Sequence, residues 1–519
     1  MSRVPTLSQQ RLNVPGVSGL LFSATEIHPE APYLRDRFGV ELSYRQSADQ
    51  VRAIAGWLAS NGVKRGDRVA IHLRNRTELA IALFATSLIG GIYVVLNSKL
   101  KEKGLHKILE QAEPVVIISE EETAPLVPEG ESIPSKLFVG DPVPSDWASW
   151  DDALKHSPVE GSWEGISVDP ACLVFTSGST GTPRGVTLSH DNIRFVVGAI
   201  QERLRYRSED TIGCFLPLAF DYGLYQIFLA AQSGSCLYIG DPDQVGPRLP
   251  KVMKEAEVSV LPGVPSVYAA LIALGRRRPL DLPCLRAITN TGERLPLSYI
   301  EELRNAFPAL EVFVMYGLTE CKRVSIMTPQ EFELHMDSVG RALDDTEVYA
   351  VSDDGERLAP GEVGELVIRG RHVAHGYWRA PEETEKRFRK RAPEAAVELF
   401  TGDSGSVDDA GYIYFSARSD DWLKHRGNRI SPVEIENEAC SLPSVVEASL
   451  HWRAADDTLH LFVTVSEEIE SEEILSALSE TLEPAKVPEF VIVLNEMPKS
   501  VNGKIDRKAL AGEVPSIQS

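Results

Sequence analysis

Apolar runs of strand length alternate with stretches of helical spacing through the first part of the chain. In chain order these segments are residues 67–73, 77–88, 93–96, 104–112 and 115–119. The odd members are short and apolar, as buried strands are, and the even members repeat their apolar positions at helical intervals. Strands that are apolar on both faces and alternate with helices predict a parallel sheet covered on both sides. The same alternation resumes after Ala171 and continues to about Phe313.

Two segments around this alternation carry weaker or more local signals. Ser47 and Gln50 form a capping-box pattern, which predicts that a helix begins there and ends near Gly62. Residues 120–170 are acidic, contain several prolines and lack a clear period. They predict a long surface excursion between two parts of the sheet.

The pattern changes in the last third of the chain. From about 337 to 416, short strands and turns predict a β-rich subdomain with one helix near residues 381–389. The last hundred residues predict a small α+β unit. Its expected helices and strands are 433–440, 445–451, 459–465 and 472–482.

Composition and charge narrow the class of protein. The chain has 519 residues, of which 43% are hydrophobic, and 53 basic against 75 acidic side chains give a net charge of −22. Such an acidic surface disfavours nucleic acid and anionic membranes as partners. None of the six cysteines forms a CxxC pair, and neither a signal-peptide core nor a membrane-spanning run is found. We therefore expect a cytoplasmic globular protein of α/β class.

The strongest local signal is the segment LVFTSGSTGTPRG, residues 173–185. An apolar strand runs into hydroxyl side chains and glycines, whose N–H groups can surround phosphate oxygens. Arg184 can add a charge-assisted contact. In isolation, a segment rich in serine, threonine and glycine is more often a flexible turn, so its meaning depends on the motifs that follow.

Four further motifs follow in order: YGLTE (316–320), TGD (401–403), ARSD (417–420) and NGK (502–504). Together with the first segment they resemble the adenylate-forming superfamily of acyl-CoA synthetases, luciferases and adenylation domains of nonribosomal peptide synthesis. The resemblance runs from about residue 42 to residue 510. It implies an N-terminal adenylation core, residues 1–419, of two α/β layers plus a β-barrel (about 337–416), and a mobile α+β C-terminal domain, residues 420–519.

The resemblance also implies a chemistry. A carboxylate attacks the α-phosphate of ATP, pyrophosphate leaves, and a thiol then takes the acyl group from the adenylate. Glu320 is expected to bind magnesium, with Thr319 beside it, and Asp403 to bind the ribose hydroxyls. The residues expected to bind ATP or AMP are Thr176, Ser177, Gly178, Ser179, Thr180, Gly181, Arg184, Asn290, Thr291, Gly292, Glu293, Tyr316, Asp403 and Arg418.

Two residues near the C-terminal domain have expected roles of a different kind. Lys504 resembles the catalytic lysine that bridges the attacking carboxylate and the α-phosphate, although a lysine in such a tail is more often solvated. Asp420 resembles the hinge about which the small domain rotates. The chain departs from the family pattern at Arg184, where lysine is usual, and at Ala417, where glycine is usual.

The segment FLPLAFDYGLYQ, residues 215–226, bears on the acid that is activated. Many CoA ligases of the superfamily carry histidine where Phe220 stands, whereas members that activate amino acids carry Phe-Asp. A carboxylate in an apolar pocket is costly unless a cation pairs with it, and a substrate amine could be that cation. Asp221 could instead cap the helix that follows it.

Lys322 and Arg323 follow Glu320 directly. One of these cations could bind a second substrate carboxylate, or both could be solvated or make structural ion pairs. GLTECKRVS together with FDYGL resembles stand-alone adenylation enzymes that load β-amino acids in macrolactam antibiotic pathways, where an Asp binds the amine. His372 and His375 lack a third ligand at suitable spacing, so we expect a structural role for them rather than a metal site.

These residues predict an ATP- and magnesium-dependent ligase that activates an amino acid, with a β-amino acid favoured. The expected acceptor is the phosphopantetheine thiol of a separate carrier protein, because no carrier-like segment follows Lys504. An acyl- or aryl-CoA ligase that uses free CoA is the alternative. A binding protein with an inactive adenylation fold is disfavoured by the intact Glu320, Asp403, Arg418 and Lys504.

Overall fold

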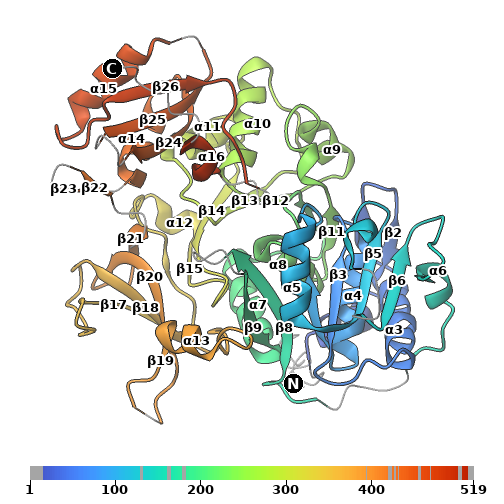
Figure 1. The fold of residues 1–519 in the computed structure, drawn as a ribbon. Coiled ribbons are helices and arrows are strands. Elements are labelled where there is room, and N and C mark those ends of the chain that lie inside the picture. Colours follow the sequence, from blue (N-terminus) through green and yellow to red (C-terminus); the bar gives the residue numbers. More distant parts are fainter. Residues whose placement is uncertain are drawn as a thin grey trace, which may run out of the picture.

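The structure is a computed structural model (Figure 1). It describes residues 16–128, 133–159, 165–177, 183–392, 394–418, 423–425, 428–430, 432–453, 458–467, 469–500 and 505–511. Gly178, Ser179, Thr180, Gly181, Asp420 and Lys504 therefore lie outside the described residues. Ser177 and Arg418 are described by their backbones alone.

The expected parallel sheet is present as a seven-stranded sheet. Its strands, in spatial order, are β7 (Ala148–Ser149), β6 (Ser135–Val139), β5 (Pro114–Glu120), β3 (Arg68–His72), β4 (Ile92–Val95), β8 (Pro170–Ser177) and β9 (Pro183–Ser189). All neighbours are parallel except β8 and β9, which form an antiparallel pair. Helix α5 (Glu102–Ala112) lies between β4 and β5 in the chain.

The prediction of a surface excursion over residues 120–170 was wrong in part. β6, β7 and the short helix α6 (Trp150–Ala153) lie within this segment, and β6 adds to the sheet beside β5. Leu137, Phe138 and Val139 are buried there. Three consecutive apolar residues among charges and prolines give little periodicity, so the strand was missed in the sequence.

A second, nine-stranded sheet is also mainly parallel. Its strands, in spatial order, are β16 (Arg341–Ala342), β15 (Ser325–Met327), β14 (Glu311–Tyr316), β13 (Ala287–Asn290), β12 (Val260–Gly263), β10 (Thr211–Cys214), β11 (Cys236–Ile239), β1 (Pro32–Asp36) and β2 (Glu41–Ser43). The strands from β14 to β1 run parallel, and the outer pairs are antiparallel. The carboxyl ends of β13 and β14 therefore lie at the same edge.

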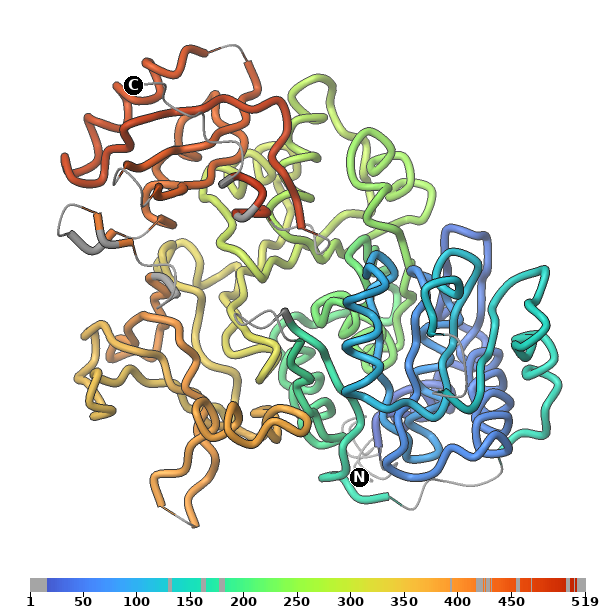
Figure 2. Tube along the Cα trace, in the orientation of Figure 1, coloured from blue at the N-terminus to red at the C-terminus, as the bar shows by residue number. Residues whose placement is uncertain are grey.

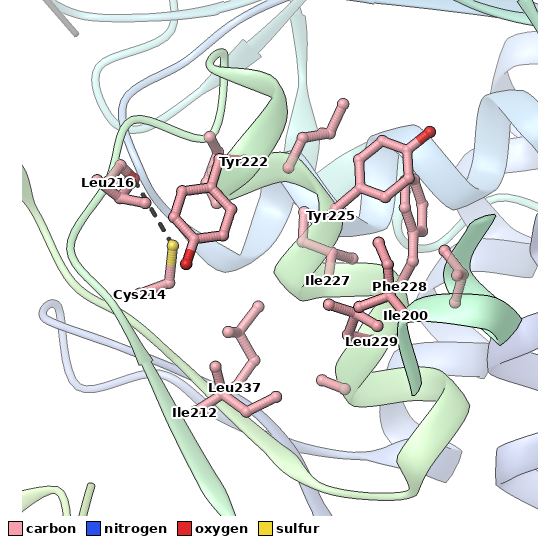
Figure 3. Packing of buried hydrophobic residues seen from close by; sticks show 14 of the residues in the cluster. Ile200, Ile212, Cys214, Leu216, Tyr222, Tyr225, Ile227, Phe228, Leu229 and Leu237 are labelled. Atoms are coloured by element: carbon pink, nitrogen blue, oxygen red, sulfur yellow. Dashed lines mark hydrogen bonds between the residues drawn. The ribbon is translucent and has the colours of Figure 1, made fainter. Parts of the chain in front are cut away.

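Helices that contact one another fill the space between the two large sheets. They are α2 (Ser18–Ile27), α3 (Tyr44–Ser60), α4 (Thr77–Leu88), α7 (His190–Leu204) and α8 (Asp221–Ser233). Their apolar residues belong to one continuous core that includes residues of both sheets. Figure 3 shows part of this core: on α8, Tyr222 lies near Cys214 of β10, whereas Tyr225 and Phe228 point to the side where Ile200 of α7 lies. α9 (Leu249–Glu255), α10 (Pro265–Arg277), α11 (Leu297–Ala306) and α12 (Pro329–Phe332) follow later in the chain.

The predicted start of α3 was wrong by one turn. The capping box is made by Ser43 and Gln46, and the helix begins at Tyr44 rather than after Ser47. Ser43 ends β2 in an extended conformation, so its hydroxyl accepts from the Gln46 N–H. The sequence offers Ser-x-x-Gln twice in succession, and the position of β2 decides which pair is used.

The segment expected to be β-rich contains a five-stranded antiparallel sheet. It contains β17 (Thr346–Val351), β18 (Gly364–Gly370), β19 (Phe388–Arg389), β20 (Glu398–Val407) and β21 (Ile413–Arg418). The expected helix is α13 (Pro381–Arg387). It ends against β20, which positions its last residue near the functional groups described below.

The C-terminal unit has a core of its own. Its elements are β22 (Leu423–His425), β23 (Asn428–Ile430), α14 (Pro432–Ser441), β24 (Val445–Arg453), β25 (Thr458–Val465), α15 (Ser471–Thr481), β26 (Phe490–Leu494) and α16 (Arg507–Ala511). Figure 2 shows this unit, in red, beside the segment that contains α10 and α11. The Ser298 hydroxyl of α11 donates to the carbonyl of Cys440 at 3.0 Å. Among the described residues, no helix is both long and apolar enough to cross a membrane.

Three buried histidines make the fold sensitive to acid. Burial lowers the pKa of His72, His190 and His372 from 6.5 to about 4. His372 lies beside the ring of Phe195, and neither of its ring nitrogens has a hydrogen-bond partner among the described residues. Because the unfolded chain binds protons near pH 6.5 and the folded chain does not, stability is full above that pH and falls as the pH drops toward 4.

We therefore expect the substitution His372→Leu to reduce the acid sensitivity of the fold. At pH 5, a histidine whose pKa falls from 6.5 to about 4 costs roughly 2 kcal/mol of folding free energy. The difference in melting temperature between pH 7.5 and pH 5.0 should be smaller in the variant than in the wild type. An equal difference in the two proteins would contradict a neutral, buried His372.

Candidate active site

The serine- and glycine-rich segment connects two strands of a hairpin. β8 enters it and β9 leaves it, with Thr176 opposite Arg184 in the antiparallel register. The Arg184 guanidinium lies 2.9 Å from the Glu383 carboxylate of α13 and faces the ring of Tyr377. The hairpin thus holds one cation at the base of the expected phosphate loop, whose residues 178–182 lie outside the described part of the chain.

Glu320 lies in the turn after β14 and is buried, with Thr319 half-buried beside it. Its Oε1 accepts from the Tyr377 hydroxyl at 2.7 Å and from Nη1 of Arg387 at 3.1 Å. The other oxygen, Oε2, has no hydrogen-bond partner among the described residues. No group of three potential metal ligands occurs in that part of the chain. A single carboxylate fits Mg²⁺ that is shared with nucleotide phosphates, not an all-protein cage.

Tyr316 and Asp403 join the nine-stranded sheet to the β-rich sheet. The Tyr316 hydroxyl, at the end of β14, donates to Oδ2 of Asp403 on β20 at 2.6 Å. Both side chains are buried. Burial and the Asp403 carboxylate raise the pKa of Tyr316, so the phenol stays protonated and can act as the donor. The backbone of Arg418 pairs with Asp403 across β20 and β21.

The segment 290–293 leaves β13 at the same edge of the sheet. Asn290 is fully buried, and neither its Oδ1 nor its Nδ2 has a hydrogen-bond partner among the described residues. A buried amide without partners is expensive unless a ligand satisfies it. This donor and acceptor pair fits the edge of a base such as adenine. Gly292 adopts a φ of +91°, which turns the chain away after Thr291.

Asp221 has a counter-ion within the protein. It is the first residue of α8, and its Oδ2 lies 3.5 Å from Nζ of Lys322. Phe220, not Asp221, is the N-cap residue and makes no side-chain capping bond. Asp221 therefore does not cap the helix, although its negative charge in the first turn is favourable for the helix dipole. The cost of burying this carboxylate is therefore offset by Lys322, without a substrate amine.

Lys322 and Arg323 are both buried, which rules out the solvated alternative. Arg323 donates from Nη1 to the Thr291 hydroxyl at 2.5 Å and lies over the Tyr222 ring, while its Nε has no hydrogen-bond partner among the described residues. Burial lowers the pKa of Arg323, yet a guanidinium remains charged at neutral pH. Asp221, Lys322 and Arg323 together carry one net positive charge.

The turn that carries these residues folds back tightly. A Cβ on Gly317 would lie 2.0 Å from the carbonyl oxygen of Lys322, so only glycine fits there. Lys322 itself has a φ of +64°, in the left-handed region that non-glycine residues rarely adopt. In this strained backbone conformation, the Lys322 side chain lies toward Asp221.

Two residues that contact Glu320 were not predicted from the sequence. Arg387, the last residue of α13, contacts both Glu320 and the carbonyl of Thr401, and Tyr377 contacts Glu320. Arg387 lies in a run of arginines and lysines that looks like an ordinary charged surface. His372 and His375 belong to no group of three potential metal ligands in the described part of the chain.

Solved structures with similar folds include CoA ligases. Over 96% of this chain the fold superimposes on an anthranilate CoA ligase in complex with anthranoyl-AMP, with a TM-score of 0.88, 24% identity and 97% of that chain covered. The crystal structure of VinN matches at 32% identity and a TM-score of 0.70, covering 78% of this chain and 98% of that one.

Two sequence relatives differ in how much of their own length this chain covers. The L-proline–[L-prolyl-carrier protein] ligase of Streptomyces coelicolor is 28% identical over 504 residues, which cover 91% of this chain and 92% of the relative. The dimodular nonribosomal peptide synthase of Bacillus subtilis is 26% identical over 480 residues, and the chain spans only 20% of its length. The match to the family described as AMP-binding enzyme extends over residues 21–378, more than half of the chain, and the protein therefore belongs to the AMP-binding enzyme family.

Proposed function

We propose that this protein uses ATP to activate an amine-bearing carboxylic acid, a β-amino acid being favoured, as its acyl-adenylate. The acyl group then passes to the phosphopantetheine thiol of a separate carrier protein. The Asp221 carboxylate at the start of α8, only 13% exposed, carries the substrate part of this proposal, because an ammonium is a natural ligand for a largely desolvated carboxylate. The prolyl-carrier protein ligase, which the chain covers almost completely, supports a carrier as acceptor.

The residues of the site divide the work of adenylation. Pyrophosphate leaves as the substrate carboxylate attacks the α-phosphate, so negative charge must be held on both sides of the reacting phosphorus. Arg184 and the loop 176–181 would hold the leaving group, and Lys504 would bridge the nucleophile and the α-phosphate. Asp403 would hold the ribose. Bound Mg²⁺ would neutralise phosphate charge, with Glu320 as its protein ligand.

The second half-reaction requires a thiol where the first requires Lys504. We propose the division into residues 1–419 and 420–519, with Asp420 as hinge, for this reason. A rotation of the small domain would withdraw Lys504 and admit the thiol. The separate core of the small unit is compatible with such a rigid-body movement, which would break the hydrogen bond between Ser298 of α11 and Cys440.

An acyl- or aryl-CoA ligase that uses free CoA is the second candidate. The single net positive charge of Asp221, Lys322 and Arg323 would also suit an acid that has a second carboxylate and no amine. The fold likeness to an anthranilate CoA ligase is compatible with this alternative. Pyrophosphate exchange measured with α-amino, β-amino and plain carboxylic acids, followed by transfer to CoA or to carrier protein, separates the candidates.

The substitution Lys504→Ala should abolish adenylate formation and leave the fold intact. A positioned cation of this kind contributes several kcal/mol to the transition state, so pyrophosphate exchange should fall by roughly a hundredfold or more. Circular dichroism and the melting temperature serve as controls for folding. Near-normal exchange in the folded variant would remove Lys504 from the chemistry.

The substitution Asp221→Ala should reverse the preference for an amine. Removal of one member of a buried charge pair costs about 3–5 kcal/mol, since the partner stays desolvated. The ratio of kcat/KM for an amino acid to that for its deaminated analogue should fall by roughly a hundredfold. If Asp221 serves only the start of α8, the ratio stays constant and only stability changes, by about 1 kcal/mol.

The substitution Tyr316→Phe keeps the ring and removes the hydrogen bond to Asp403. A hydrogen bond to a charged group contributes about 1.5–3 kcal/mol, so KM for ATP should rise roughly tenfold or more. Discrimination between ATP and 2′-deoxy-ATP should shrink as well, because the Asp403 carboxylate is less well oriented. Tyr414→Phe, whose hydroxyl contacts Asp408 instead, is the matched control. Unchanged discrimination would separate Tyr316 from ribose binding.

A further inference from the structure

Helix α13 presents two charged side chains on one face, and each pairs with a group outside the helix. Glu383 and Arg387 are four positions apart, which places them on the same face. Oε2 of Glu383 lies 2.9 Å from Nη2 of Arg184, in the strand that leaves the expected phosphate loop. Nη1 of Arg387 lies 3.1 Å from Oε1 of Glu320. One helix thus supplies an anion to the cation expected to bind pyrophosphate, and a cation to the carboxylate expected to bind magnesium.

The position of α13 is fixed by the segment that precedes it. The Thr384 hydroxyl accepts a hydrogen bond from the backbone N–H of Tyr377 at 2.9 Å. The rings of Tyr377 and Phe388 also pack edge to face, with their centres 5.5 Å apart. Tyr377 in turn donates from its hydroxyl to Glu320 and faces Arg184 with its ring. α13 is therefore held against the residue that contacts both of its charge partners.

Both charged side chains of α13 also have a second partner. Oε1 of Glu383 lies 2.6 Å from Nζ of Lys386 on the same helix. Arg387 donates from Nη2 to the Thr401 carbonyl, and Gly402 leaves room for the guanidinium, because a Cβ there would lie 2.8 Å from Nη2. The two outer ion pairs can therefore open while each side chain of α13 keeps a hydrogen-bond partner, which lowers the cost of opening them.

We propose that α13 carries an internal substitute for magnesium pyrophosphate. Glu383 takes the place of the pyrophosphate anion on Arg184, and Arg387 takes the place of the metal cation on Glu320. Both ion pairs open when ATP binds with its metal ion, and both form again as magnesium pyrophosphate leaves. The two side chains thus compete with the leaving group for its protein ligands and speed its release. This assignment rests on the proposed function, in which Arg184 binds pyrophosphate and Glu320 binds magnesium.

Charge balance gives the physical reason for such a substitute. Without magnesium pyrophosphate, Arg184 and Glu320 would be unpaired charges, although their side chains are only 20% and 11% exposed. An unpaired charge in a largely desolvated position is costly, so a site without counter-ions of its own would retain the leaving group strongly. The guanidinium of Arg184 increases this retention, because it can hold two phosphate oxygens at once.

Direct binding of inorganic pyrophosphate in the presence of Mg²⁺ tests the role of Glu383. Isothermal titration calorimetry on the full chain compares the wild type with Glu383→Gln and with Glu385→Gln, a change of equal charge at an exposed position of the same helix. Removal of the competing carboxylate should lower the Kd of pyrophosphate by about three- to fivefold, the range that a partly exposed ion pair allows. Glu385→Gln should match the wild type. Equal affinities in Glu383→Gln and the wild type would overturn the proposal.

A double-mutant cycle tests whether Glu383 acts through Arg184. Pyrophosphate should bind more weakly to Arg184→Met, and the further change Glu383→Gln should then alter the Kd by less than about 1.5-fold, because the contested cation is gone. A gain in affinity of undiminished size in that background would contradict competition for Arg184, since it would come from the removal of a negative charge alone.

The variant Arg387→Met tests the metal side of the proposal. Mn²⁺ is the probe, and electron paramagnetic resonance measures its affinity for the protein at saturating pyrophosphate. Loss of the competing guanidinium should tighten Mn²⁺ binding by about three- to fivefold. Arg389→Met, an exposed position whose guanidinium lies over the Phe400 ring, should behave like the wild type. Unchanged or weaker Mn²⁺ binding in Arg387→Met would overturn the substitution at Glu320. If this variant does not fold, the pyrophosphate measurement on Glu383→Gln decides alone.

Binding to the wild type separates this inference from the proposed function. If the wild type binds neither ATP nor pyrophosphate in the presence of Mg²⁺, the proposed function fails, and the competition by α13 fails with it. If the wild type binds both ligands and the α13 variants match their controls, the proposed function stands and the role of α13 alone is wrong.

Discussion

The tight turn after β14 is the constraint on which the arrangement of the site depends. Gly317 allows the chain to fold back onto the carbonyl of Lys322, at a distance that no side chain would permit. Within eight residues the turn therefore sends four functional groups to four different partners. Tyr316 reaches the β-rich sheet, Glu320 reaches α13, Lys322 reaches α8, and Arg323 reaches the end of β13. A change in this turn would disturb the expected nucleotide and acid sites together.

Helix α13 connects two groups that are expected to bind the triphosphate, Arg184 and Glu320. Its Glu383 pairs with Arg184 beside the phosphate loop, and its Arg387 pairs with Glu320. The two residues are four positions apart, so they lie on one face of the helix. α13 thus balances a cation and a carboxylate that both lie where nucleotide charge is expected. Arg387 also contacts the carbonyl of Thr401, two residues before Asp403.

The net charge of the protein and the net charge of the Asp221, Lys322 and Arg323 cluster have opposite signs. The chain carries a net charge of −22, while Asp221, Lys322 and Arg323 together are positive. The buried positive charge of this cluster therefore contrasts with the negative charge of the chain as a whole.

Local sequence determined much of this protein, because strand and helix periods, glycine-rich loops and short motifs act over a few residues. The parallel strands, the β-rich segment, α13 and the small C-terminal unit could all be predicted in this way. The start of α3 could not be predicted, because the position of β2 decides which of two capping pairs is used. Strand β6 could not be predicted either, because its short apolar run becomes a strand by pairing with β5.

The partners within the site were decided by tertiary structure. The Phe-Asp resemblance and the apolar residues around Asp221 suggested an external amine, whereas Lys322, 101 residues later, lies 3.5 Å away in the fold. Arg387 reaches Glu320 across 67 residues for the same reason. Residue types and motifs indicate which chemical groups a site contains. Which of those groups neutralise one another depends on how strands from distant parts of the chain meet at one sheet edge, and burial there turns proximity into a strong interaction.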